Sequence, residues 1–209
     1  MATWTNFYIN TDKVKSVVEK LSDLTDNLVI TYDTDFPSDM GDYQQLDTDL
    51  APNYIAVGQT ELNWTTVVHN SFDKMEDWGE LLSHHFECKI IVTIAQSASS
   101  SYYFALYDNG QKVREIETCY STDFEEINFG QKFAFENDKL GHKLEWDDEE
   151  DAYLFTFEDI ETYCSHFGLT IQLDYSEVNW TVLKGQNLRK EVFEYVQKLI
   201  TKKPWWKLW

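Results

Sequence analysis

Apolar residues recur at helical spacing in four separate segments of the chain. Positions three and four residues apart lie on one face of an α-helix, so each segment is expected to bury that face. The first two stripes are Val14, Val17, Val18, Leu21 and Leu24, and then Phe72, Met75, Gly79, Leu82 and Phe86. The other two are Ile160, Tyr163 or Cys164 and Phe167, and then Leu188, Val192, Tyr195, Val196 and Leu199. The pattern therefore predicts four helices.

Polar residues and turn formers mark where these helices should begin and end. Thr11, and then either Asn70 or Ser71, are suitable N-caps for the first two helices, because a side-chain oxygen can accept a hydrogen bond from an unpaired helix amide. Gly168 supplies a left-handed stop after the third helix. Pro204 is expected to end the fourth helix.

Residues 101–108 and 111–118 flank the dipeptide Asn109-Gly110. Asn-Gly favours a type I′ turn with positive φ at both central residues, so the sequence predicts a tight β-hairpin. A two-residue loop fixes the register. The expected opposite pairs are Tyr107 with Lys112, Ala105 with Arg114, and Tyr103 with Ile116.

The two faces of this hairpin differ in polarity. The more apolar face carries Tyr102, Phe104, Leu106 and Val113. We expect this face to meet a helix, since burial of apolar area is the main stabilising contribution. The opposite face places cations beside tyrosines and is expected to lie nearer water.

The run from Lys89 to Ala95 is apolar without alternation, which predicts an interior strand beside the hairpin. Strands joined by short loops, with helices between groups of strands, indicate an α+β fold. We expect a mostly antiparallel sheet, or sheets, with helices packed on one face. Residues 1–209 are expected to form a single globular unit, or two lobes with a seam near residues 136–151.

The predicted fold includes a repeated strand–helix–strand unit. Trp4-Thr5 and Trp64-Thr65 stand 60 residues apart, and each precedes a helical stripe and then an apolar strand. Another Trp-Thr pair, at Trp180, also precedes a helical stripe. Self-similarity at a fixed period is typical of duplication. Several matches are apolar positions that any such unit would share, so coincidence is the alternative.

Charge divides the chain into two unequal parts. The 17 basic and 37 acidic residues give a net charge of −20. Residues 184–209 hold seven basic and two acidic residues, so they carry +5 and residues 1–183 carry −25. Duplex DNA favours clustered lysine and arginine, so no nucleic-acid partner is expected. An acidic surface instead fits a basic protein partner, or simply keeps the chain in solution.

The cysteines and the first residues bear on the compartment. Cys88, Cys119 and Cys164 are odd in number and widely spaced, so no disulfide framework is expected. Reduced thiols fit a cytoplasmic protein. The segment after Met1 lacks a basic stretch followed by an apolar run, so no secretory signal is expected. No stretch approaches 18 apolar residues, and no membrane span is expected.

Histidines and cysteines raise the question of a metal site. His84, His85 and Cys88 lie close together, and Cys164 with His166 forms a second pair. Zinc needs about four ligands in suitable geometry, and nothing in the sequence unites the two groups. The helical stripe predicts instead that His85 is a partly buried, hydrogen-bonded histidine.

An acidic loop invites comparison with calcium sites. Its aspartates are Asp33, Asp35, Asp39, Asp42, Asp47 and Asp49. An EF-hand beginning at Asp33 would require suitable residues where Pro37, Ser38 and Gln44 stand, and none of the three fits. A solvated loop is expected, and the sequence predicts no metal and no cofactor.

Two segments are candidates for binding a partner. The first is the acidic run Asp147, Asp148, Glu149, Glu150 and Asp151. Such a run is either a solvated connector or a docking patch for a basic protein. The second is the tail, in which Trp205, Trp206 and Trp209 are interleaved with Lys202, Lys203 and Lys207.

Three interpretations of the tail are open. The tryptophans can pack on the acidic body, because indoles left in water are costly. They can bind a partner or a second copy of the chain, since tryptophan is enriched at binding hot spots. They can also lie at a membrane interface.

The sequence contains neither Gly-x-Ser-x-Gly nor a glycine-rich phosphate loop. We therefore expect a non-enzymatic bacterial binding protein, of inhibitor or immunity type, that meets a basic partner through its acidic surface. The alternative is an enzyme whose active-site residues are dispersed along the chain.

Overall fold

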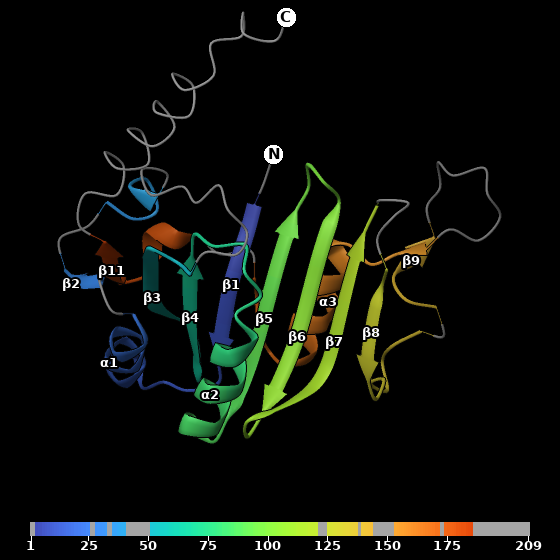
Figure 1. Ribbon diagram of the computed structural model, residues 1–209, viewed down its shortest axis with the longest axis horizontal. Coiled ribbons are helices and arrows are strands. Elements are labelled where there is room, and N and C mark those ends of the chain that lie inside the picture. Colours follow the sequence, from blue (N-terminus) through green and yellow to red (C-terminus); the bar gives the residue numbers. More distant parts are fainter. Residues whose placement is uncertain are drawn as a thin grey trace, which may run out of the picture.

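The computed structural model describes residues 3–25, 28–32, 35–40, 51–120, 125–137, 139–143, 153–171 and 174–185. Within these ranges, nine strands form one sheet in the order β2-β11-β3-β4-β1-β5-β6-β7-β8 (Figure 1). Every neighbouring pair is antiparallel. The strands are β1 (Thr3–Ile9), β2 (Leu28–Thr31), β3 (Tyr54–Glu61), β4 (Trp64–His69), β5 (Lys89–Gln96), β6 (Ser101–Asp108), β7 (Gln111–Cys119), β8 (Ile127–Gly130) and β11 (Thr181–Gly185). The mixed α+β class and the large antiparallel sheet are therefore as predicted.

Strands from distant parts of the chain share this sheet. β1 lies in the middle, between β4 and β5, and strands β5 to β8 follow in chain order. β11 is inserted between β2 and β3, so it pairs with strands about 150 and about 125 residues earlier in the chain. A separate pair is formed by β9 (His142–Lys143) and β10 (Tyr153–Leu154).

Two helices cover one face of the sheet. α1 (Val14–Leu24) and α2 (Glu76–Phe86) contribute to a core that includes Val17, Leu21 and Leu82. Strand residues such as Phe7 and Ile90 complete this core from below. The apolar stripe predicted from the sequence is thus the buried stripe of α1.

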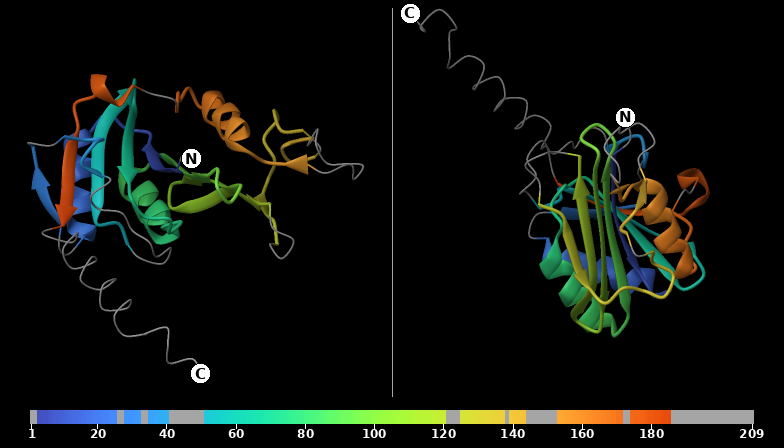
Figure 2. Two further views of the ribbon diagram at one scale, coloured as in Figure 1. Left: turned by 90° about the horizontal axis from the view of Figure 1, so that it is seen from above. Right: turned by 90° about the vertical axis from the view of Figure 1, so that its right-hand side faces the viewer.

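The third helix corrects the prediction that the helices share one face. α3 (Phe157–His166) packs on the opposite side of the sheet from α2, against Ile91 and Phe104 (Figure 2). The strands explain this, because β5 is apolar on both faces and must be covered on both. Gly168 follows α3 with a φ of 71°, as the left-handed stop predicted for it.

Part of this second face is covered without an α-helix. Phe36, Tyr175 and Trp180 lie over β3, β4 and β11, and the ring centroids of Phe36 and Trp180 are 4.7 Å apart. Tyr175 belongs to the short 3₁₀-helix η2 (Tyr175–Glu177). These aromatic side chains thus cover this part of the face, as α3 covers another part.

The hairpin forms as predicted at its turn but not along its length. Asn109 and Gly110 have φ values of 49° and 83°, and Tyr107 lies opposite Lys112. The register then shifts beside Tyr107, so that Arg114 faces Leu106 rather than Ala105, and Ile116 faces Phe104 rather than Tyr103. The predicted pairings of Ala105 and Tyr103 are therefore wrong by one residue.

The start of α2 also differs from the prediction. The helix begins at Glu76, well after Asn70 and Ser71. The chain between them is held by short-range hydrogen bonds, in which Ser71 Oγ accepts from the Asp73 amide at 3.0 Å. Asp73 Oδ1 accepts in turn from the Met75 amide at 2.7 Å. For α1, Thr11 accepts from the Lys13 amide at 3.3 Å, just before the helix.

The repeated strand–helix–strand unit is not confirmed. β1 and β2, which flank α1, are separated in the sheet by β4, β3 and β11. β4 and β5, which flank α2, are separated by β1 alone. The predicted fourth helix, over residues 188–199, lies outside the described residues. None of the helices in the described part combines the length and apolar character needed to cross a membrane.

Candidate binding groove beside helix α2

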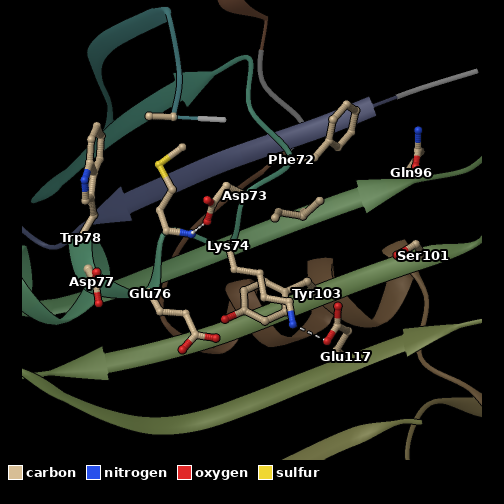
Figure 3. Close-up of a pocket in the computed structure, with 13 residues that line it drawn as sticks. Phe72, Asp73, Lys74, Glu76, Asp77, Trp78, Gln96, Ser101, Tyr103 and Glu117 are labelled. Carbon is tan, nitrogen blue, oxygen red and sulfur yellow. Dashed lines mark hydrogen bonds and ion pairs between the residues drawn. The ribbon is translucent and has the colours of Figure 1, made fainter. Parts of the chain in front are cut away.

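A groove of about 630 Å³ lies where the chain enters α2, above strands β5, β6 and β7 (Figure 3). Its lining mixes aromatic rings, carboxylates and one lysine. The side chains that matter most are Phe72, Asp73, Lys74, Glu76, Asp77, Trp78, Tyr103 and Glu117. We refer to this cavity as the α2 groove.

Lys74 is the cation of the α2 groove. Its Nζ lies 2.5 Å from Glu117 Oε2 and 5.2 Å from the ring centroid of Tyr103 (Figure 3). A cation gains from a carboxylate and from the negative face of an aromatic ring. Tyr103 and Glu117 are opposite residues of β6 and β7, so the sheet itself builds this arrangement.

A second set of charges lies deeper, below α2. Lys112 Nζ is 2.9 Å from Glu76 Oε2 and 3.0 Å from Glu115 Oε2. The Tyr103 hydroxyl donates to Glu115 Oε1 at 3.2 Å. Partial burial alone would lower the pKa of Lys112, but its hydrogen bonds to Glu76 and Glu115 raise that pKa above its ordinary value. Lys112 is therefore charged around neutral pH.

Burial keeps the phenols of this region neutral. Burial raises the pKa of Tyr103 far above its ordinary value and raises the pKa of Tyr107 to about 12. Tyr107 packs directly under α2, because Gly79 has no side chain to hold the helix away. Tyr103 therefore offers the groove an uncharged ring.

Acids exceed bases on the side of the molecule formed by α2 and the outer surfaces of β6 and β7, which we call the α2 face. Its carboxylates are Asp73, Glu76, Asp77, Glu80, Glu87, Glu115 and Glu117, and its lysines are Lys74 and Lys112. Seven acids and two lysines leave a formal balance of −5. Both lysines already pair with acids of the same face.

The exposed acids of the α2 face are therefore left with surplus negative charge. Asp77, Glu80 and Glu87 are all exposed, and Asp77 lines the groove. Carboxylates gathered around a partly enclosed space with apolar walls focus their field outward. The arrangement can attract and hold a cation.

Cys88, Cys164 and the buried His69 do not equip this groove for nucleophilic chemistry. Burial raises the pKa of Cys88 to about 11, and burial raises that of Cys164 still further. Thiols with raised pKa values are poor nucleophiles. Burial lowers the pKa of His69 to about 3, and none of these three residues lines the groove.

The candidate metal ligands are not assembled. Among the described residues, no group of three or more histidines, cysteines or acids is arranged to hold a metal ion. His84 and His85 are exposed, so the expectation that His85 is partly buried is wrong. Cys164 is buried on the far face, where the ring of His166 stacks on Phe135 at 3.7 Å.

Only part of the acidic loop falls within the described residues. Asp39 accepts a hydrogen bond from the hydroxyl of Tyr54 and lies 3.1 Å from Lys184 Nζ. That aspartate is thus engaged in joining the segment before β3 to β11. Asp33, Asp42, Asp47 and Asp49 lie outside the described residues.

The residues that the sequence predicts to bind a partner also lie outside the described residues. They are Asp147, Asp148, Glu149, Glu150, Asp151, Trp205, Trp206 and Trp209. The sequence predicts tyrosines beside cations on one hairpin face, and this face is expected to lie nearer water. Tyr103, Tyr107 and Lys112 do lie together on the face beneath α2, and Tyr103 lines the groove. The expectation is wrong in two respects, because Tyr103 is only 2% exposed and Arg114 lies on the opposite face.

The sequence does not predict the α2 groove, because the groove depends on the hairpin register. With the shift beside Tyr107, Tyr103 lies opposite Glu117, and these two residues form the place where Lys74 is held. The register predicted from the sequence instead places Tyr103 opposite Ile116. Comparison with protein-family models, curated proteins and solved structures found no match for this chain.

Proposed function

We propose that this chain is a non-enzymatic binding protein that engages a basic protein through its α2 face, with the α2 groove at the centre of the contact. An inhibitor or immunity-type protein of a bacterium would use such a surface. The observation that carries the proposal is the surplus of carboxylates on the α2 face, since both lysines of that face are already paired.

Physical considerations favour a basic protein over other partners. Opposite charge on two surfaces speeds their association and discriminates against acidic competitors. The aromatic walls of the groove, Phe72 and Trp78, add the apolar contact that holds a partner after encounter. Phosphate groups would be repelled by the same carboxylates.

The dispersed enzyme is the less favoured alternative. In the described part of the chain, the groove contains acids, a lysine and a buried tyrosine. Lys74 is engaged in an ion pair with Glu117. A base that is neutral near the working pH, or an activated nucleophile, is what catalysis in such a groove would require.

The first test is a charge reversal on the α2 face. Asp77→Lys places a cation at the groove, whereas Glu177→Lys makes the same change in η2, where the acid is also exposed and also in a first helical turn. The probe is a labelled peptide of alternating arginine and alanine, followed by fluorescence anisotropy. We expect Asp77→Lys to weaken binding about tenfold, equal to about 1.4 kcal/mol, and Glu177→Lys to change it little.

The second arm of this test is salt. Between about 0.1 M and about 1 M salt the screening length falls from about 10 Å to about 3 Å, so binding of the peptide should weaken steeply. A citrulline version of the peptide, which keeps the shape but lacks the charge, should not bind. Equal effects of the two charge reversals, or binding that ignores salt, would contradict the proposal.

A further inference from the structure

We infer that Lys74 occupies the position of a ligand, and that the α2 groove binds an arginine side chain of the basic partner in its place. This inference rests on the proposed function and adds the chemical group that the groove recognises. The site consists of the Glu117 carboxylate and the face of Tyr103, which Lys74 now covers.

The cation site is prepared by the sheet. Tyr103 and Glu117 stand opposite each other on neighbouring strands, so their separation is set by the ladder of β6 and β7. The Tyr103 hydroxyl is turned away and bound to Glu115, which leaves the ring face to the groove. A pre-positioned ring and carboxylate recognise a cation with little loss of side-chain freedom.

Lys74 can leave this site without disturbing the fold around it. The backbone there is fixed by the hydrogen bonds of Ser71 and Asp73, which do not involve the lysine side chain. The Lys74 side chain is 30% exposed and that of Glu117 is 14% exposed. Partly exposed ion pairs are readily exchanged for others.

Lys112 provides the contrast within the same face. Its side chain is 15% exposed, and it bridges two acids, Glu76 and Glu115, that come from α2 and β7. It therefore holds the helix to the sheet. In the described part of the chain Lys74 pairs with a single acid, and it lies at the open groove, so it is the lysine that a ligand can replace.

The size and walls of the groove favour arginine over a smaller cation. A volume of about 630 Å³ extends beyond the space that Lys74 needs, toward Phe72, Trp78 and Asp77. A guanidinium group can stack on the Tyr103 ring while two of its N–H groups bind the Glu117 carboxylate. A lysine of the partner would fit the charge but not the bidentate geometry.

The experiment compares two lysines of equal charge, one in the groove and one in an ion pair outside it. Lys74→Ala empties the proposed site, whereas Lys89→Ala removes the partner of Asp108, away from the groove. Each change lowers the net charge by one unit. We expect Lys74→Ala to bind the arginine peptide about fivefold more tightly than the unaltered chain does. The reason is that removal of the lysine side chain leaves the Tyr103 ring and the Glu117 carboxylate available to a guanidinium group of the peptide.

The matched acid variants test the same site from the other side. Glu117→Gln removes the carboxylate of the site, and Asp108→Asn removes the equivalent acid of the Lys89 pair. Glu117→Gln should abolish the gain caused by Lys74→Ala when the two are combined. Asp108→Asn should leave that gain intact. Thermal unfolding of each variant shows whether it is folded. If Lys74→Ala is not folded, Lys74→Met, which keeps the apolar part of the side chain, replaces it.

The outcomes separate this inference from the proposed function. If Lys74→Ala and Lys89→Ala strengthen binding equally, the effect is one of net charge, and the arginine site is overturned while the basic partner stands. If a peptide of residues 202–209 shows the dependence on Lys74 and the arginine peptide does not, the occupant is the chain's own tail, and the inference is overturned. If no variant binds any basic peptide, both the inference and the proposed function fail.

Discussion

His69 is a histidine whose side chain is buried in the core of the fold. It is 1% exposed at the end of β4, and its Nδ1 accepts from the Ser71 amide at 3.3 Å. The ring proton must therefore be on Nε2, which has no hydrogen-bond partner among the described residues. Burial lowers the pKa of His69 to about 3, because taking a charged imidazolium out of water is costly.

This histidine makes stability depend on pH. The unfolded chain binds a proton at His69 below its ordinary pKa of 6.5, whereas the folded chain does not until about pH 3. The unfolded state thus binds more protons in that window, and stability falls as the pH falls from 6.5 to 3. His69 should contribute a loss of about 1.4 kcal/mol per pH unit.

Urea unfolding over this pH range measures that contribution. His69→Gln should flatten the pH dependence, and His84→Gln, which alters an exposed histidine on α2, should not. Identical pH profiles for the two variants would show that acid destabilisation comes from other groups.

Gly79 reverses the usual effect of placing alanine in a helix. Alanine is favoured over glycine in a helix by about 1 kcal/mol. A Cβ at position 79, however, would come within 2.5 Å of the Tyr107 ring. Gly79→Ala should therefore destabilise the protein by about 1–3 kcal/mol, as overpacked cores do.

Chemical denaturation of three variants checks this expectation. Glu80→Ala, the next residue on the exposed side of α2, should be nearly neutral. Combining Gly79→Ala with Tyr107→Leu should give less than the sum of the two separate losses, because the leucine makes room. Additive losses would mean that Tyr107 is not what limits position 79.

At the scale of the element, a buried ion pair fastens the segment after β8 to the sheet. Arg114 is fully buried, and its Nε and Nη2 donate to Glu136 at 2.9 and 2.7 Å. Its Nη1 donates to the Phe129 carbonyl of β8 at 2.6 Å. Burial alone would raise the pKa of Glu136, but the hydrogen bonds from Arg114 lower it below its ordinary value.

Removing one member of this pair should be costly. Glu136→Ala leaves the Arg114 guanidinium buried without its counter-charge, so we expect a loss of about 3–5 kcal/mol in the free energy of unfolding. Glu19→Ala breaks the exposed pair between Lys15 and Glu19 on α1, and it should cost little. Equal losses in thermal or urea unfolding would be incompatible with a buried role for Glu136.

The same arginine explains what the hairpin sequence could not reveal. Asn109-Gly110 and the alternating residues around it were enough to predict the turn and both strands. The register shift turns Arg114 toward Glu136 on one face and leaves Glu115 and Glu117 on the other, beneath α2. Because these partners lie far along the chain, no local pattern in the hairpin indicates the shift.

At the scale of the whole molecule, local pattern predicted elements better than their placement. The stripes of α1 and α3, the stop at Gly168 and the interior strand β5 all follow from spacing. The side of the sheet on which α3 packs does not, because both faces of β5 and β6 are apolar and either could accept a helix. The α2 groove requires both the tertiary position of α2 and the corrected register, so it had no signature in the sequence.

The position of β11 has a consequence for how the chain is made. Among the described strands, β2 pairs with β11 and with no other, and β11 ends at Gly185. During synthesis from the N-terminus, β1 and strands β3 to β8 can assemble as they leave the ribosome. β2 has no β11 strand to pair with until more than 150 further residues have been translated. A nascent chain released before Gly185 would expose β2 as an unpaired strand, available for pairing with another chain.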